Sequence, residues 1–207
     1  MSEITYRVAI PSDKQRIGKF LLEHFWPDEP TFKAAGVLPS DEENEDCLRC
    51  IDYGTCTIAE DQNGIIAGVR LAKVRVPSDI EKAADKPWSQ FDQIFEFLRI
   101  IAVNAKVFER YNVDKLLQSM LICVSRDFRG KGIGLKLYSE NMELGKKLGY
   151  KVYVCDCTSA FSAKLCEKLG MECIAAWDYS EYLDEDGKQL FTPDSVHDKL
   201  RVYGKAL

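Results

Sequence analysis

The sequence predicts a mixed α/β fold, of the α+β kind, in a single domain that spans residues 1–207. Three observations support this prediction. Segments with the two-residue apolar period of a strand and segments with the three-to-four-residue period of a helix follow one another along the whole chain. A hydrophobic content of 46% with 29% charged residues is that of one ordinary globular domain. The sequence contains no internal repeat, low-complexity tract or linker at which to divide it.

The first elements are predicted as strand, helix and loop. Alternating β-branched residues over 4–10 indicate a strand, and Pro11-Ser12-Asp13 then begins a helix that continues to His24. The segment 26–30 holds two prolines within four residues. Because proline lacks an N–H group and restricts the residue before it, this segment is predicted to be a stiff loop without regular helix.

A helix and a hairpin are predicted next. Ser40 followed by Glu43 is a capping box, which predicts a helix running to about residue 53. An Asn-Gly pair between the extended segments 56–60 and 65–76 predicts a tight turn joining two antiparallel strands.

The second half begins with a long predicted helix. Apolar residues at three- and four-residue spacing indicate about five helical turns over 91–108. The continuous apolar run at 120–124 predicts a buried strand that leads directly into the densest glycine cluster of the chain. The alternation then continues with a helix from residue 133, a strand at 151–157, a helix at 160–169, a strand at 172–177, an acidic turn at 184–187 and a last strand at 197–203.

Charge and hydropathy exclude several kinds of partner. The formal net charge of −5 argues against a general nucleic-acid-binding surface. No stretch approaches the roughly 18 uncharged apolar residues of a membrane helix, and frequent charges among the first 25 residues exclude a secretory signal. We therefore expect a cytoplasmic protein with no nucleic-acid or membrane partner, and a monomer rather than an obligate oligomer.

Eight cysteines are the unusual feature of the composition. One C-x-x-C pair occurs, at Cys47 and Cys50, and a structural zinc would need a second pair at similar spacing. The nearest candidates are Cys155 and Cys157, which share one face of a predicted strand, an arrangement that suits packing as well as ligation. Without a secretory signal, the sequence predicts reduced, free thiols and no bound metal.

The glycine cluster carries the clearest functional signal. Its glycines let the backbone turn so that successive amides converge on a phosphate, and the following helix adds the positive end of its dipole. Leu135 stands where both a Walker loop and a dinucleotide fingerprint would require glycine, which excludes these two loops. The charged residues of the segment give a local net charge of +3 and are Arg126, Asp127, Arg129, Lys131 and Lys136.

The pattern Arg-x-x-Gly-x-Gly at 129–134 resembles the acetyl-coenzyme A pyrophosphate loop of the GCN5-related N-acetyltransferase (GNAT) superfamily. The resemblance runs from residue 4 to the C-terminus and implies a central mixed, mostly antiparallel sheet of about seven strands flanked by helices. It also implies acetyl-CoA as acyl donor, and a strand before the loop that separates from its neighbour and leaves amides free to stabilise an oxyanion. The implied cofactor contacts are Cys123, Val124, Arg129, Gly130, Lys131, Gly132, Ile133, Gly134 and Ser162.

Three further segments resemble the insect arylalkylamine N-acetyltransferases within that superfamily. They are the Asp-Glu-Pro element in 25–30, the serine-bearing turn in 158–164, and the Pro-x-x-x-His element that begins at residue 193. The resemblance implies that Glu29 is the general base. An alkylamine is protonated near pH 7, with a pKa of roughly 10, so a base must take its proton before it attacks a thioester.

The role of Glu29 has alternatives. Burial would raise the pKa of its carboxyl group toward the useful range, but Glu29 could also bind the ammonium group without taking a proton, or be an ordinary loop carboxylate. Asp28 is the neighbouring candidate for the same role.

The general acid is less clearly indicated. Many superfamily members carry a tyrosine on the helix where this chain has Cys166. Its absence directs attention to Ser162 and Thr158, each of which could instead cap the helix, or to Cys166 itself. His197 is a further catalytic candidate that could orient a water molecule or the base, or simply be packed.

The predicted acceptor site is rich in aromatic residues, although each is also ordinary core material. Their number favours an arylalkylamine or related biogenic amine. The predicted substrate contacts are Phe25, Trp26, Asp28, Pro30, Phe32 and Phe161.

The leading hypothesis is an acetyl-CoA-dependent amine N-acetyltransferase that works by direct attack in a ternary complex, without a metal or an acyl-enzyme. One alternative is a protein or peptide N-terminal acetyltransferase. The other is a non-catalytic acyl-CoA-binding protein that has kept the phosphate loop and lost turnover.

Overall fold

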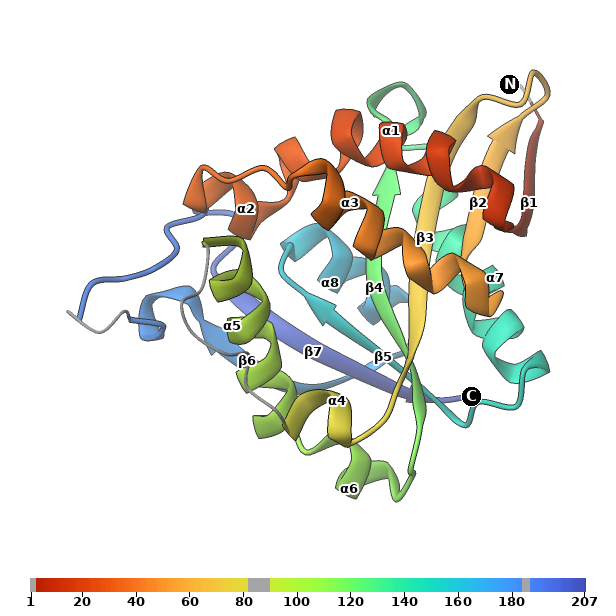
Figure 1. Ribbon diagram of the computed structural model, residues 1–207. Helices are drawn as coiled ribbons and strands as arrows, with labels where there is room; N and C mark the ends of the chain where they lie inside the picture. Colours follow the sequence, from red (N-terminus) through yellow and green to blue (C-terminus); the bar gives the residue numbers. More distant parts are fainter. Residues whose placement is uncertain (1–2, 82–89, 184–186) are drawn as a thin grey trace.

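The computed structural model describes residues 3–81, 90–183 and 187–207 and is built on one seven-stranded sheet in the order β1-β2-β3-β4-β5-β7-β6 (Figure 1). β4 and β5 run parallel, whereas every other neighbouring pair in the sheet is antiparallel. The predicted mixed, mostly antiparallel sheet is therefore confirmed. Its strands are β1 Ile4–Val8, β2 Thr57–Asp61, β3 Ile66–Arg75, β4 Leu116–Val124, β5 Val152–Cys157, β6 Glu172–Asp178 and β7 Lys199–Ala206.

Helices cover both faces of the sheet (Figure 1). Residues of α1, α2, α3 and α5 pack in the largest apolar core on one face, and residues of α7 and α8 pack on the opposite face. Alternate residues of β5 enter the two cores, because successive side chains of a strand point to opposite faces. The helices are α1 Lys14–His24, α2 Pro30–Ala35, α3 Asp41–Cys47, α4 Ser78–Glu81, α5 Gln90–Asn104, α6 Val107–Tyr111, α7 Ile133–Lys147 and α8 Ala160–Lys168.

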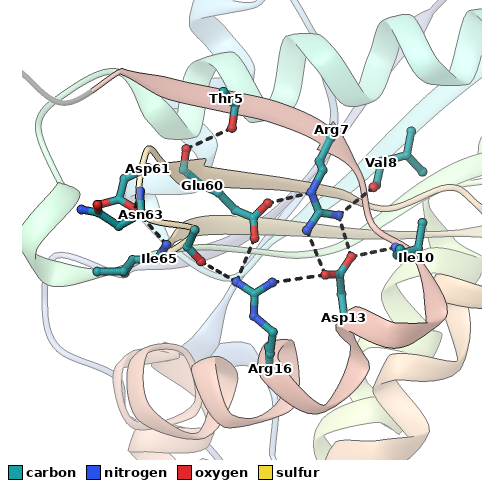
Figure 2. A network of polar contacts seen from close by, with 11 residues as sticks. Thr5, Arg7, Val8, Ile10, Asp13, Arg16, Glu60, Asp61, Asn63 and Ile65 are labelled. Carbon is teal, nitrogen blue, oxygen red and sulfur yellow. Dashed lines mark hydrogen bonds and ion pairs between the residues drawn. The ribbon is translucent and has the colours of Figure 1, made fainter.

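A network of ion pairs holds β1 and the start of α1 against β2 (Figure 2). Asp13 accepts hydrogen bonds from Arg7 at 2.6 and 2.9 Å and from the Ile10 amide at 2.9 Å. Glu60 accepts from Arg7 at 2.6 Å and from Arg16 at 2.8 Å. The hydrogen bonds from Arg7 are the main reason why the pKa of Asp13 lies below its usual value. Both carboxylates are buried, so this network is stronger than a set of isolated surface pairs.

Several local predictions are confirmed. The capping box is present, with Ser40 accepting from the Glu43 amide and Glu43 accepting from the Ser40 amide, and the chain continues after α3 as the 3₁₀ segment Leu48–Tyr53. β2 and β3 form the predicted hairpin. Residues 184–186 of the predicted acidic turn lie outside the described residues. Among the described residues, no helix is both long enough and apolar enough to cross a membrane.

Two predicted elements differ from the structure. The predicted loop at 26–30 is a 3₁₀ turn, Trp26–Asp28, followed at once by α2. The prediction is wrong there because Pro30 occupies the first helical position, where a missing N–H group costs nothing. The helix predicted over 91–108 is divided into α5 and α6 at Lys106, whose φ of 47° is left-handed and breaks the helical path.

The sheet opens between β4 and β5, which positions the candidate site. Their parallel pairing ends at Ser119 and Cys155. The β3–β4 register shifts next to this point and leaves Met120 without a β3 partner, as at a β-bulge. β4 continues to Val124 beside β3, and β5 continues to Cys157 beside β7. The separation of strands that the family resemblance implies is thus present, directly before the glycine-rich loop.

Candidate active site

The loop between β4 and α7 has the conformation of an anion-binding turn. Gly130 and Gly132 have φ values of 76° and 78°, which glycine adopts far more easily than other residues. Gly132 is the N-cap residue of α7, and no side chain of the described residues caps this helix. The first N–H groups of α7 therefore have no intrahelical acceptor, and they lie at the positive end of a 15-residue helix. This geometry fits the diphosphate of coenzyme A.

The cations of the loop are largely paired in the free protein. Asp28 accepts hydrogen bonds from Arg126 at 2.8 Å and from Arg129 at 2.9 Å, and these two arginines, Arg126 first, hold the pKa of Asp28 below its usual value. Lys136 contacts Glu140 at 2.6 Å, and Lys131 donates to a backbone carbonyl of the loop at 2.8 Å. The surplus charge of +3 predicted from this segment alone is therefore reduced by carboxylates from outside it.

Cys123 and Val124 lie on the part of β4 that has no β5 partner. The Cys123 side chain is buried in the core, and burial raises the pKa of its thiol to about 12. The Val124 carbonyl accepts a hydrogen bond from Arg129 at 3.1 Å. Ile133 is also buried, so Cys123 and Ile133 can offer a ligand their backbone groups rather than their side chains.

Glu29 is the N-cap residue of α2 and is 7% exposed. Its Oε2 accepts three hydrogen bonds: from the amides of Thr31 and Phe32, each at 2.8 Å, and from the Thr31 hydroxyl at 2.6 Å. Oε1 accepts no hydrogen bond from any described residue. The carboxylate is therefore fixed through one oxygen while the other remains available. The sequence contains the signal for this cap, a polar residue directly before a helix-starting proline.

Two titratable residues, Tyr179 and His197, are influenced electrostatically by the Glu29 carboxylate. The Tyr179 hydroxyl donates to the Thr158 carbonyl at 2.8 Å. Nδ1 of His197 accepts from the Ala160 amide, at the start of α8, at 3.2 Å. Burial lowers the pKa of His197, although the nearby carboxylates of Asp194 and Glu29 act in the opposite direction. Burial raises the pKa of Tyr179, and the negative charge of Glu29 raises it further. Tyr179, for which the sequence has no local signal, thus contacts Thr158, and the charge of Glu29 acts on both Tyr179 and His197.

The hydroxyl and thiol candidates on α8 are placed differently from one another. Ser159, not Ser162, caps α8, by accepting from the Phe161 amide at 3.0 Å. Ser162 is partly buried and donates to the Ser159 carbonyl at 2.8 Å. Cys166 is fully buried in the core behind the sheet, where its sulfur contacts other sulfurs and the Tyr138 hydroxyl. The Cys166 thiol is therefore closed to solvent.

The predicted aromatic contacts fall into two groups. Phe25, Trp26 and Phe32 belong to one cluster with Phe91 of α5, with ring centroids of successive members 4.9 to 5.3 Å apart. Trp26 and Phe32 are buried within this cluster, and Pro30 is buried beside them. Phe161 lies elsewhere, is 62% exposed and packs edge-on against the His197 ring.

A separate hollow of about 960 Å³ lies among α4, α5, α6 and the segment before β4. Its lining includes Ile80, Arg99 and Tyr150 but none of the predicted site residues. We assign no role to it.

Comparison with known proteins agrees with this geometry. Residues 18–171 match the model of the acetyltransferase (GNAT) family. The chain belongs to this family. A solved structure of mosquito arylalkylamine N-acetyltransferase like 5b is 32% identical, with a TM-score of 0.91 over 99% of this chain and 100% of that one. Arylalkylamine N-acetyltransferase 2 from Aedes aegypti is 26% identical, with a TM-score of 0.89 and 99% of both chains covered.

A third relative has a different acceptor. Drosophila melanogaster polyamine N-acetyltransferase, which catalyses the formation of N-acetylagmatine, is 26% identical, with a TM-score of 0.85 over 99% of this chain and 100% of that one. Members of the GNAT family transfer an acetyl group from acetyl-CoA to an acceptor. Family membership therefore confirms the resemblance found in the sequence, and it accounts for the anion-binding loop.

Proposed function

We propose that this protein transfers the acetyl group of acetyl-CoA to the primary amine of a small arylalkylamine or related biogenic amine. Acetyl transfer is the activity of the family, and arylalkylamine and polyamine N-acetyltransferases are among the similar structures. The reaction is direct attack by the amine on the thioester within a ternary complex. The residues at 129–134 and the free edge of β4 hold the acetyl-CoA.

The placement of the Glu29 carboxylate is the observation that carries this proposal. One oxygen is held by three hydrogen bonds, and the other is open to accept a proton from an ammonium group directly or through water. Asp28, the next residue, contacts Arg129 of the loop, so the acceptor side and the donor side meet at this segment. A buried, oriented carboxylate next to the donor loop is what a general base for this reaction requires.

The neighbouring groups have supporting roles in this mechanism. The aromatic cluster around Phe32 forms one wall for the acceptor. His197, whose lowered pKa keeps the imidazole neutral at pH 7, orients a water molecule or the base. The leaving thiolate has a conjugate acid with a pKa near 8.5, so a proton donor assists without being essential. Ser162 and Thr158 remain the candidates for that donor.

The test follows thiol release from acetyl-CoA by the purified protein with a panel of arylalkylamines, histamine, agmatine and polyamines. We expect turnover with at least one arylalkylamine or biogenic amine. Replacing Glu29 by Gln keeps an oxygen that can cap α2 but removes the base, and it should lower kcat/KM by about 10²- to 10⁴-fold. Acetyl-CoA affinity should stay unchanged.

Glu23→Gln is the matched control, because that side chain is 74% exposed on α1. Acetyl-CoA binding without turnover on any amine would favour the non-catalytic alternative. Turnover confined to peptide N-termini would favour the N-terminal acetyltransferase. An unchanged pH profile of kcat/KM in Glu29→Gln would remove Glu29 as the base.

A further inference from the structure

Three cysteine sulfurs and a tyrosine hydroxyl converge in the core behind the sheet, on the side covered by α7 and α8. The sulfurs of Cys155 and Cys157 are 3.4 Å apart, and those of Cys157 and Cys166 are 3.5 Å apart. All three lie within 4.8 Å of one another. The Tyr138 hydroxyl is 3.1 Å from the Cys155 sulfur and 3.6 Å from the Cys166 sulfur. The four side chains are 0 to 3% exposed.

A buried arginine lies against this group of atoms. Arg70 of β3 is 0% exposed, and its guanidinium carbon is 3.3 Å from the centre of the Tyr138 ring. Its Nε donates to the Tyr153 hydroxyl at 2.6 Å, and one terminal nitrogen is 3.9 Å from the Cys155 sulfur. The other terminal nitrogen is buried and has no hydrogen-bond partner among the described residues, and no described carboxylate pairs with Arg70. A buried cation without a counter-charge is costly.

The spacing of the four donor atoms matches a tetrahedral metal site. A tetrahedron with zinc–sulfur bonds of about 2.3 Å has sulfur–sulfur edges of about 3.8 Å, and a zinc–oxygen bond of about 2.1 Å shortens the oxygen–sulfur edges to about 3.6 Å. Four of the six donor–donor separations, at 3.1 to 3.6 Å, lie within about 0.5 Å of these edges, and the third sulfur pair, Cys155 and Cys166, is no more than 4.8 Å apart. Three sulfurs with one oxygen are a thiophilic donor set.

We propose that Cys155, Cys157 and Cys166, with the Tyr138 hydroxyl as fourth ligand, form a structural zinc site. A Zn²⁺ ion with three thiolates carries one negative charge, which the adjacent Arg70 guanidinium balances. The three thiol protons leave to solvent as the ion binds. The ion would link β5, α7 and α8, the elements that carry the coenzyme loop and the start of the acceptor turn. This proposal does not depend on the identity of the acceptor.

Metal content and zinc titration test the site directly. The wild-type protein is prepared from zinc-supplemented growth and, after chelation, titrated anaerobically with Zn²⁺ alone against a chromophoric chelator. Because the ligands are buried, each point is equilibrated for hours. We expect one zinc per chain by native mass spectrometry, a higher Tm with zinc, and a cobalt-to-sulfur charge-transfer band when Co²⁺ replaces it.

Substitutions locate the ion. Cys166→Ser and Cys157→Ser should lose zinc binding and the zinc-dependent rise in Tm. Cys50→Ser is the matched control, because the Cys50 sulfur lies 3.5 Å from that of Cys56 in a second buried thiol pair, and it should keep one zinc per chain. Tyr138→Phe leaves all three sulfurs in place and should weaken binding without abolishing it.

The wild-type measurement stands whether or not a variant folds. A metal-free wild-type protein after both loading routes would overturn the proposal. Stoichiometric Cu⁺ binding with no Zn²⁺ binding would overturn the assignment to zinc. Full retention of zinc in folded Cys157→Ser and Cys166→Ser would place the ion elsewhere.

Discussion

Replacing Gly68 by alanine tests how closely β3, β4 and α7 approach one another beside the glycine-rich loop. Gly68 pairs with Val124 of β4. A Cβ atom there would lie 2.9 Å from the backbone oxygen of Cys123, 3.0 Å from Cδ1 of Leu137 and 3.4 Å from Cγ2 of Ile133. The first contact is with backbone held in the sheet, so it cannot be relieved by a change of rotamer.

Two opposing effects set the magnitude. Replacing glycine by alanine reduces the entropy of the unfolded chain and stabilises by about 0.4–1 kcal/mol, whereas overpacking a close contact costs about 1–3 kcal/mol. The cost of overpacking exceeds the entropic gain, and we expect a net loss of about 1–2 kcal/mol in the free energy of unfolding. For a chain of 207 residues, at about 2–4 °C per kcal/mol, the Tm should fall by about 2–8 °C.

The assay is thermal unfolding followed by circular dichroism, together with the KM for acetyl-CoA. We expect the KM to rise in Gly68→Ala, because both β4 and the start of α7 must shift. Gly18→Ala is the control. The new Cβ atom would meet only side-chain atoms, of Leu48 at 3.1 Å and of Asn44 at 3.2 Å. Alanine also favours the helix over glycine by about 0.8–1 kcal/mol. A Gly68→Ala protein with a Tm at or above that of the wild type would refute the reasoning.

Three further changes are each measured by urea denaturation. Tyr153→Phe removes the hydroxyl that accepts from Arg70 at 2.6 Å and donates to Asn141 at 2.8 Å. The free energy of unfolding should fall by about 2–4 kcal/mol, and a variant as stable as the wild type would contradict this. Burial raises the pKa of Asp156 to about 6, so the folded state holds a proton that the unfolded state releases near pH 4. Wild-type stability should therefore fall relative to Asp156→Asn as pH rises from 4 to 7, by up to about 3 kcal/mol, whereas a difference independent of pH would contradict this. Lys106→Gly relieves the left-handed φ of 47° and should stabilise by about 1 kcal/mol; no gain would mean that the position carries no strain.

Signals that are local in the sequence predict their structures well. The capping box at Ser40, the Asn-Gly hairpin and the glycine-rich turn at 129–134 each depend on residues within a few positions of one another. Glu29 shows the limit of that approach. The Glu-Pro pair contains a helix start, but a rule that treats proline only as a helix breaker predicts a loop at the same place.

Contacts between segments that are distant in the sequence could not be predicted from it. The meeting of Cys166 with Cys155 and Cys157 requires α8 to pack on β5, and the approach of Arg70 requires β3 to cross the same core. Tyr179 reaches Thr158 because β5 and β6 both run antiparallel to β7 and therefore end at the same edge of the sheet. Each position depends on strand order, which apolar periodicity does not determine.

Asp28 and Glu29 are adjacent in the sequence but lie in opposite electrostatic surroundings. Asp28 is turned to Arg126 and Arg129 of the glycine-rich loop, whereas Glu29 is turned into the first turn of its own helix. The division follows from the position of Pro30, because the residue before the first helical position must cap the helix and its predecessor cannot. A phosphate that approaches Arg129 therefore meets a carboxylate already bound there. If the loop binds the coenzyme as proposed, its affinity would depend on the conformation of the segment that carries Glu29, and the proposed acceptor and donor sides would be coupled through two neighbouring residues.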